Sequence, residues 1–164
     1  MLGLLALEGE RSGYDLAKQA ERSVGHVWGP TKSHLYAVLR RLATEGLVRA
    51  REVEQQGRPD KQLYSLTDAG RASFDAWLDD PVPGDRGALV LRLFLGGLAS
   101  AESHRRTLEL FRDDVQDERD RFAVIDARNT RRGHDLFHGV VLDLGIARAQ
   151  ASLDWADARL QELA

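Results

Sequence analysis

Seven Lys and Arg side chains lie in one short stretch of the chain, between Thr31 and Ser65, against four Asp and Glu side chains. This stretch has a net charge of +3, whereas the whole chain has a formal net charge of −3. Basic side chains at this density can neutralise phosphates, and an arginine can also bond the edge of a guanine. The stretch therefore indicates binding to a polyanion such as DNA. A solvated charged helix and hairpin without a ligand is the alternative that charge alone leaves open.

The first part of the basic stretch is predicted to be a helix that Thr31 caps and Gly46 ends. Its apolar residues recur at steps of three and four and form one stripe. These residues are Leu35, Val38, Leu39 and Leu42. The opposite side is polar and basic and carries, with its flanks, Ser33, Tyr36, Ala37, Arg40 and Arg41.

The second part alternates as a two-stranded ribbon, from Leu47 to Val53 and from Leu63 to Leu66, around a turn at 55–60. Gly57 suits a turn position with positive φ, and Pro59 stiffens the turn. A basic helix followed by a ribbon with a basic tip is the outline of a winged helix-turn-helix. Such a helix can enter a DNA major groove, and the tip can reach a neighbouring backbone or minor groove.

The rest of the chain is predicted to be a second, helical domain. Two prolines, a glycine and three acidic residues between Asp79 and Asp85 mark a linker. The predicted domains are therefore 1–80 and 88–164, joined by a linker at 81–87. The fold class is mainly α with a small β-wing.

Long apolar seams in the second domain predict a homodimer, because one chain offers these helices few partners. An intramolecular bundle is the alternative. The predicted dimerisation residues are Leu108, Phe111, Val115, Phe137, Val140, Leu144 and Trp155.

Several strings resemble the PadR family of transcriptional regulators over residues 1 to about 80. They are MLGLLAL, SGYDLAK, WGPTKSHLYAVLRRLATEGLV and GRPDKQLYSLTDAGR. LRLFLGGL and LDLGIARAQASLDWADARLQEL are similar to the longer helical C-terminal domain of one PadR subfamily, which is related to virulence activators. The resemblance implies a homodimeric DNA-binding protein, mostly a repressor, in which the C-terminal helices make the dimer and a small molecule often releases the DNA.

By position, the resemblance implies that Ser33, Tyr36 and Arg40 lie on the DNA-facing recognition helix. It also implies that Gly57, Arg58 and Pro59 form the wing tip. The chain departs from the family where Lys32-Ser33-His34 replaces a Pro-Gly-Ser run of many members, so Ser33 need not be the equivalent serine.

Two recognition helices about one helical turn apart would read an inverted repeat in double-stranded DNA. Arg40 is the best candidate to reach a guanine edge or a phosphate, and Arg58 can enter a narrow minor groove. The Tyr36 hydroxyl can bond a phosphate, or the ring can be half-buried core. The side chains expected to meet phosphates are Lys32, Arg41, Arg58 and Lys61.

No catalytic, metal or cofactor site is predicted, and the chain is not expected to be an enzyme. His134 and His138 share a helix face, but HDLFH lacks the internal Glu of a zinc-protease motif and no third ligand follows by spacing. A small-molecule effector is a candidate partner, in a pocket where two domains or two protomers meet. Its candidate lining residues are Trp28, Trp77 and Trp155, although Trp28 also suits the core beside its turn.

The composition favours a cytoplasmic protein that is not in a membrane. The chain has no Cys and no apolar run of about 18 residues, and Glu8 and Glu10 interrupt its apolar start. A competing function is a winged-helix interaction adaptor that does not bind DNA. The basic helix and the GRP tip favour DNA binding, because an adaptor does not need that local charge.

Overall fold

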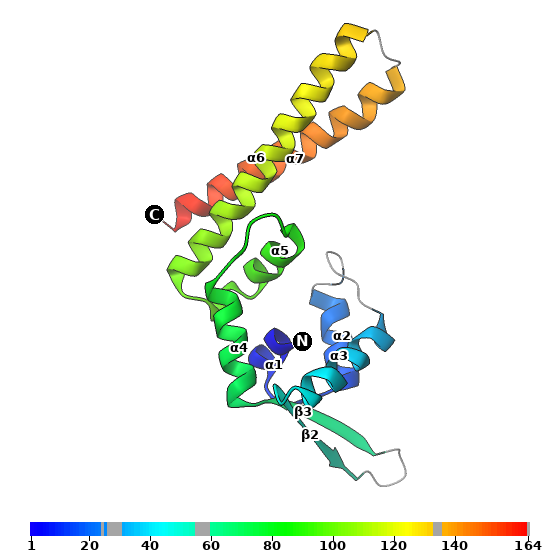
Figure 1. Cartoon of the computed structure of the whole chain (residues 1–164), viewed down its shortest axis with the longest axis vertical. Coiled ribbons are helices and arrows are strands. Elements are labelled where there is room, and N and C mark those ends of the chain that lie inside the picture. Colours follow the sequence, from blue (N-terminus) through cyan, green and yellow to red (C-terminus); the bar gives the residue numbers. More distant parts are fainter. Residues whose placement is uncertain (24, 26–30, 55–59, 133–135, 164) are drawn as a thin grey trace. The chain divides into compact units, whose positions relative to one another are not determined.

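Two compact units make up the chain (Figure 1). The first comprises Met1–Asp80 and Phe94–Ala99, and the second comprises Pro81–Leu93 and Ser100–Ala164. This computed structural model describes residues 1–23, 25, 31–54, 60–132 and 136–163, with the backbone alone at 129–132 and 136–138. Most elements are helices, and one small antiparallel sheet lies in the first unit, so the predicted class of mainly α with a small β-wing is confirmed.

The first unit combines short helices with the sheet. In chain order its elements are α1 (Leu2–Glu8), β1 (Arg11–Ser12), α2 (Gly13–Ser23), α3 (Lys32–Thr44), β2 (Val48–Val53), β3 (Lys61–Leu66), α4 (Asp68–Asp79) and the 3₁₀ turn η1 (Gly96–Leu98).

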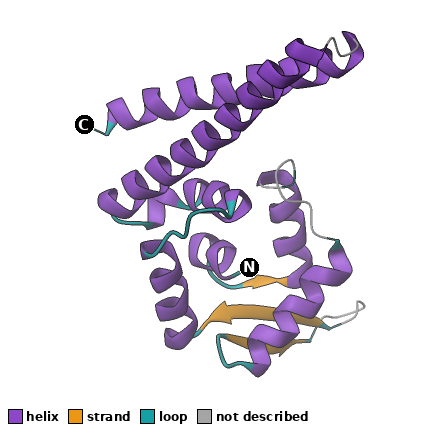
Figure 2. Ribbon diagram, turned by 45° about the horizontal axis from the view of Figure 1, so that its top comes forward, coloured by secondary structure: helices purple, strands orange, loops and turns teal. Residues whose placement is uncertain are grey.

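The sheet has three strands in the order β1-β3-β2, which Figure 2 shows in orange. β3 pairs with both neighbours, so that Tyr64 lies opposite Arg11 on one side and opposite Ala50 on the other. The prediction of a two-stranded ribbon was therefore incomplete. β1 has only two residues, which is too short for an alternating pattern, and only its pairing with β3 reveals it.

Local signals place the ends of α3. The Thr31 side chain accepts a hydrogen bond from the His34 N–H, as predicted for the N-cap. At the other end Gly46 has φ +72°, and the N–H groups of Gly46 and Leu47 bond the carbonyls of Ala43 and Leu42. This pattern is a Schellman motif, and its positive φ explains the glycine.

The start of α4 is bonded to the turn after α3. Thr67 Oγ1 accepts from the Gly70 N–H and donates to the Gly46 carbonyl, and the Thr67 N–H bonds the Leu47 carbonyl. A Cβ atom on Gly70 would lie 1.8 Å from the Leu47 carbonyl oxygen. Only glycine therefore allows this approach, which fixes α4 against the turn that links α3 to the wing.

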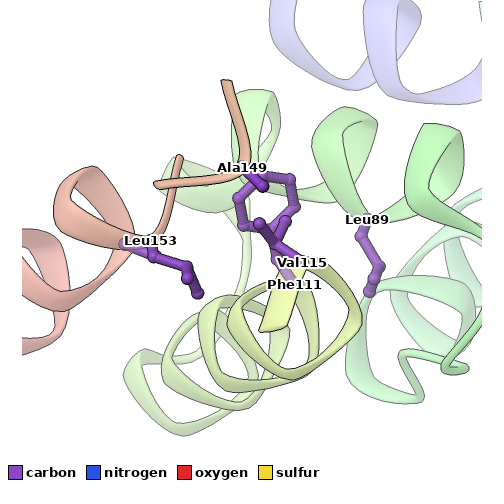
Figure 3. Packing of buried hydrophobic residues seen from close by; sticks show 6 residues of the cluster. Leu89, Phe111, Val115, Ala149 and Leu153 are labelled. Carbon is purple, nitrogen blue, oxygen red and sulfur yellow. The ribbon is translucent and has the colours of Figure 1, made fainter. Parts of the chain in front are cut away.

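The second unit contains α5 (Arg86–Phe94), α6 (Ala101–Arg132) and α7 (Leu136–Glu162). The Ser103 N–H donates a hydrogen bond to Ser100 Oγ, which caps the long helix α6. The core joins all three helices (Figure 3). Its buried residues are Leu89, Phe111, Val115, Ala149, Leu153 and Ala156.

Ion pairs extend this core at its surface. The Arg86 guanidinium lies 2.9 Å from Asp114 and 2.6 Å from Glu118, and Arg112 lies 2.5 Å from Asp157 of α7.

No helix in the described part of the chain combines the length and the apolar character that crossing a bilayer requires.

Candidate nucleic-acid interface

The two faces of α3 differ sharply in burial. Leu35, Leu39 and Leu42 are 2%, 0% and 6% exposed and anchor the helix in the core of the first unit. The polar side is open to solvent, as the periodicity predicted. Its exposed residues are Lys32, Ser33, Tyr36, Ala37, Arg40 and Arg41. A rigidly held helix thus presents three cations and two hydroxyl groups to solvent.

Tyr36 contacts the start of α2 while its side chain stays 39% exposed. A Cβ atom on Gly13 would lie 2.5 Å from Tyr36 Cε1, so the ring lies directly against the glycine backbone. The half-buried ring matches one of the two sequence interpretations of Tyr36, and the phosphate contact stays a prediction. The ring packs between α2 and α3, and enough of the side chain is exposed for contact with a ligand.

Tyr64 of β3 is buried and only 4% exposed. Its hydroxyl donates a hydrogen bond to Gln62 Oε1 at 2.7 Å. Burial raises the pKa of Tyr64; the nearby Tyr36 also raises it, and the Arg40 charge lowers it. The Tyr64 hydroxyl therefore interacts electrostatically with two side chains of α3. Sequence reasoning treated Tyr64 only as a strand residue.

Two cations of the wing strands are paired with acids from the segment before and at the start of α2. Lys61 Nζ lies 3.1 Å from Asp15 Oδ2, and Arg51 bonds both carboxylate oxygens of Glu10. The side-chain hydrogen bond from Arg51 lowers the pKa of Glu10. Sequence reasoning missed Glu10 and the pairing role of Asp15, because their partners are far along the chain. The wing-tip residues Gly57, Arg58 and Pro59 lie outside the described residues.

The predicted dimerisation residues fall into two groups. Leu108, Phe111 and Val115 are 1%, 8% and 1% exposed, and thus are buried within the chain's own core. Three residues of α7 are open to solvent, with exposed fractions of 57% at Val140, 58% at Leu144 and 45% at Trp155. The side chain of Phe137 lies outside the described part.

Two of the three tryptophans considered for an effector pocket pack on phenylalanines of their own units. Trp77 stacks on Phe74 with ring centroids 6.2 Å apart, and Trp155 meets Phe111 edge-on at 5.7 Å. Trp28 and His134 lie outside the described residues, as does the side chain of His138. Where the structure is described, no three His, Asp or Glu side chains gather as a metal site would require.

A capped, solvent-facing basic helix followed by an antiparallel wing defines a winged helix-turn-helix protein. The model of the transcriptional regulator PadR-like family matches residues 1–76, and that of the virulence activator alpha C-terminal domain matches residues 86–164. The chain is 30% identical to the probable transcriptional regulator Rv1176c of Mycobacterium tuberculosis, over 89% of this chain and 86% of that protein. The chain belongs to the PadR-like family of transcriptional regulators.

Two further likenesses concern one Bacillus subtilis protein. Its negative transcriptional regulator PadR is 31% identical over 71% of this chain and 63% of that protein. The crystal structure of Bacillus subtilis PadR in complex with operator DNA aligns with 99% of this chain and 96% of that chain, with 21% identity and a TM-score of 0.45.

Proposed function

We propose that this transcriptional regulator is a repressor that binds an inverted repeat in double-stranded DNA as a homodimer. The observation that carries the proposal is the solvent-exposed basic face of α3, opposite three leucines that fix the helix in the core. An α-helix fits the major groove, where base edges can be read. A helix anchored on one side can present its other side in a defined orientation.

The proposed contacts follow from the position of each side chain on α3. Arg40 reads a guanine edge or contacts a phosphate, and its charge lowers the pKa of Tyr64. Lys32 at the first turn and Arg41 contact phosphates. Arg41 lies 3.6 Å from Glu45, but both side chains are largely exposed, so this pair is weak and readily exchanged for a phosphate. Ser33 and Tyr36 offer hydroxyl groups to the backbone, and Gly57, Arg58 and Pro59 form the wing tip.

The proposed dimer uses the open side of α7. Val140, Leu144 and Trp155 are large apolar side chains that together would be costly to leave in water. Phe111 and Val115 of α6 support this surface from within, because they pack in one core with Ala149, Leu153 and Ala156 of α7. Leu108 of α6 is buried as well. A two-fold axis between two copies would set the two α3 helices about one turn of DNA apart.

The proposal includes a response to a small molecule. Bacillus subtilis PadR has been crystallised with p-coumaric acid. For this chain we propose only that a small molecule weakens DNA binding. In a pocket between protomers Trp155, which is 45% exposed in the single chain, offers an aromatic side chain to such a ligand; Trp77 is half-buried.

The deciding experiment is selection of bound DNA from a random pool, repeated with candidate small molecules present. We expect an enriched inverted repeat, and we expect Arg40→Ala to weaken its binding about five- to 150-fold, in line with loss of one base contact. Recovery of no sequence, together with no binding to duplex DNA at low salt, would favour the interaction adaptor instead.

A further inference from the structure

We propose that Glu10 and Asp15 tether the two long strands of the wing through Arg51 and Lys61, so that these two cations position the wing and do not contact DNA phosphates. The proposal rests on the proposed DNA binding and assigns roles within the same surface. It separates Arg51 and Lys61, which pair with carboxylates, from Lys32 and Arg49, which form no ion pair with a described residue.

Lys61 is held at the first residue of β3. Its Nζ lies 3.1 Å from Asp15 Oδ2, on the first turn of α2. Asp15 is itself fixed, because Ser12 Oγ donates to the same carboxylate at 2.6 Å and accepts from the Asp15 N–H at 3.2 Å. The ammonium group therefore meets a carboxylate whose position is already set by the helix cap.

Arg51 is held in the middle of β2. Its Nε lies 2.8 Å from Glu10 Oε1 and its Nη2 lies 2.5 Å from Glu10 Oε2. This bidentate geometry is the one in which a guanidinium binds a carboxylate most specifically. β3 lies between β2 and β1, so the Glu10–Arg51 pair reaches across the whole width of the sheet.

Together the two pairs fasten both strands of the wing to the segment that starts α2. Each pair is partly exposed, and a single exposed ion pair contributes little to global stability. Loss of a pair is therefore expected to loosen β2 and β3 locally, with little change in the global stability of the protein. Each pair also supplies a counter-charge to its cation, so a phosphate contact would leave a carboxylate without its partner close to the DNA backbone.

The chain offers matched controls for both roles. Arg49 is two residues before Arg51 on the same strand and is also exposed, but no carboxylate among the described residues forms an ion pair with it. Glu52 is an exposed acid on that strand that likewise forms no ion pair with a described residue. Lys32 on α3 is the counterpart of Lys61, since it forms no ion pair within the described part of the chain.

Hydrogen exchange of the free protein tests the tethers without DNA. We expect Glu10→Gln, Asp15→Asn and Arg51→Ala to speed exchange of the β2 and β3 amides by up to about fivefold, as loss of an exposed pair allows. Arg49→Ala and Glu52→Gln should leave exchange unchanged, and Lys61→Arg should preserve the wild-type rate. Equal effects of Arg49→Ala and Arg51→Ala would overturn the tether.

Salt dependence of binding to the selected operator tests the phosphate assignment. Lys32→Ala should reduce the slope of log affinity against log salt by about 0.9, the value for one lost phosphate contact, whereas Lys61→Ala and Arg51→Ala should leave the slope unchanged. A reduction of about 0.9 for Lys61→Ala would overturn the inference. Absence of any DNA binding by the wild type would instead contradict the proposed function, and the exchange measurements would still decide whether the tethers exist.

Discussion

Asp15 shows how one side chain serves two parts of the structure. It belongs to the cap of α2 through Ser12 and to the wing through Lys61. The Ser12 hydroxyl is the largest influence that lowers the pKa of Asp15, and the hydrogen bond from Lys61 lowers it further. The ionised carboxylate is therefore the form that supports both contacts.

Removing either partner should raise the pKa of Asp15, and Ser12→Ala should raise it more than Lys61→Ala. NMR titration of the Asp15 carboxyl in each variant measures this order. Because the pKa is lowered on folding, the contribution of Asp15 to stability is complete above the ordinary carboxyl pKa of about 4 and disappears as the pH falls through the lowered value. The difference in unfolding free energy between the wild type and Asp15→Asn should thus disappear at acidic pH. A larger shift for Lys61→Ala would contradict the assigned causes.

Arg58 permits a second prediction at the scale of one residue. If this side chain contacts one phosphate at the wing tip, Arg58→Ala should weaken binding to all DNA sequences alike and reduce the salt slope by about 0.9. Fluorescence anisotropy with operator and unrelated duplexes, over a range of salt concentrations, measures both effects. An unchanged slope would count against the phosphate contact.

Among the elements, α4 depends on close contact with the turn between α3 and β2. Gly70→Ala would place a Cβ atom 1.8 Å from the Leu47 carbonyl oxygen, where backbone must move. We expect it to destabilise the protein by about 1–3 kcal/mol or more, as overpacking does. Urea unfolding measures the loss. Gly97→Ala is the control, since a Cβ there would meet nothing within 4 Å.

α7 has two apolar faces with different expected roles. Leu153 is 4% exposed in the core of the second unit, whereas Leu144 on the same helix is 58% exposed. Leu153→Ala should cost about 2–5 kcal/mol, because it leaves a cavity. Leu144→Ala should change the unfolding free energy much less at protein concentrations where the chain is monomeric. Urea titrations at several protein concentrations compare the two variants.

At the scale of the whole molecule, a substitution that prevents dimerisation should also weaken DNA binding. Leu144→Glu places a charge on the proposed apolar interface and should yield a folded monomer, measured by sedimentation and circular dichroism. This monomer should bind the operator much more weakly than the wild type, because one α3 helix reads only one half-site. Inserting about five base pairs between half-sites should have a similar effect, since it turns them to opposite faces of the duplex. A Leu144→Glu dimer with unchanged affinity would rule out this interface.

The sequence by itself determined the features that arise from neighbours along the chain. The stripe of Leu35, Leu39 and Leu42 follows from helical periodicity, and the caps at Thr31, Thr67 and Ser100 use side chains three residues from their partners. The strands β2 and β3 follow from the alternating residue pattern of this stretch. These signals are local, so the outline of a winged helix and the family resemblance could be read before any coordinates.

Only the tertiary structure decided which distant residues meet. It paired the two-residue β1 with β3, and it joined Glu10 to Arg51 and Asp15 to Lys61 across the wing. It also shows which apolar face of α7 is buried: Leu153 lies in the core, whereas Leu144 is exposed. Periodicity places side chains on a face of a helix or strand, but the partner of that face depends on packing between elements far apart in the chain.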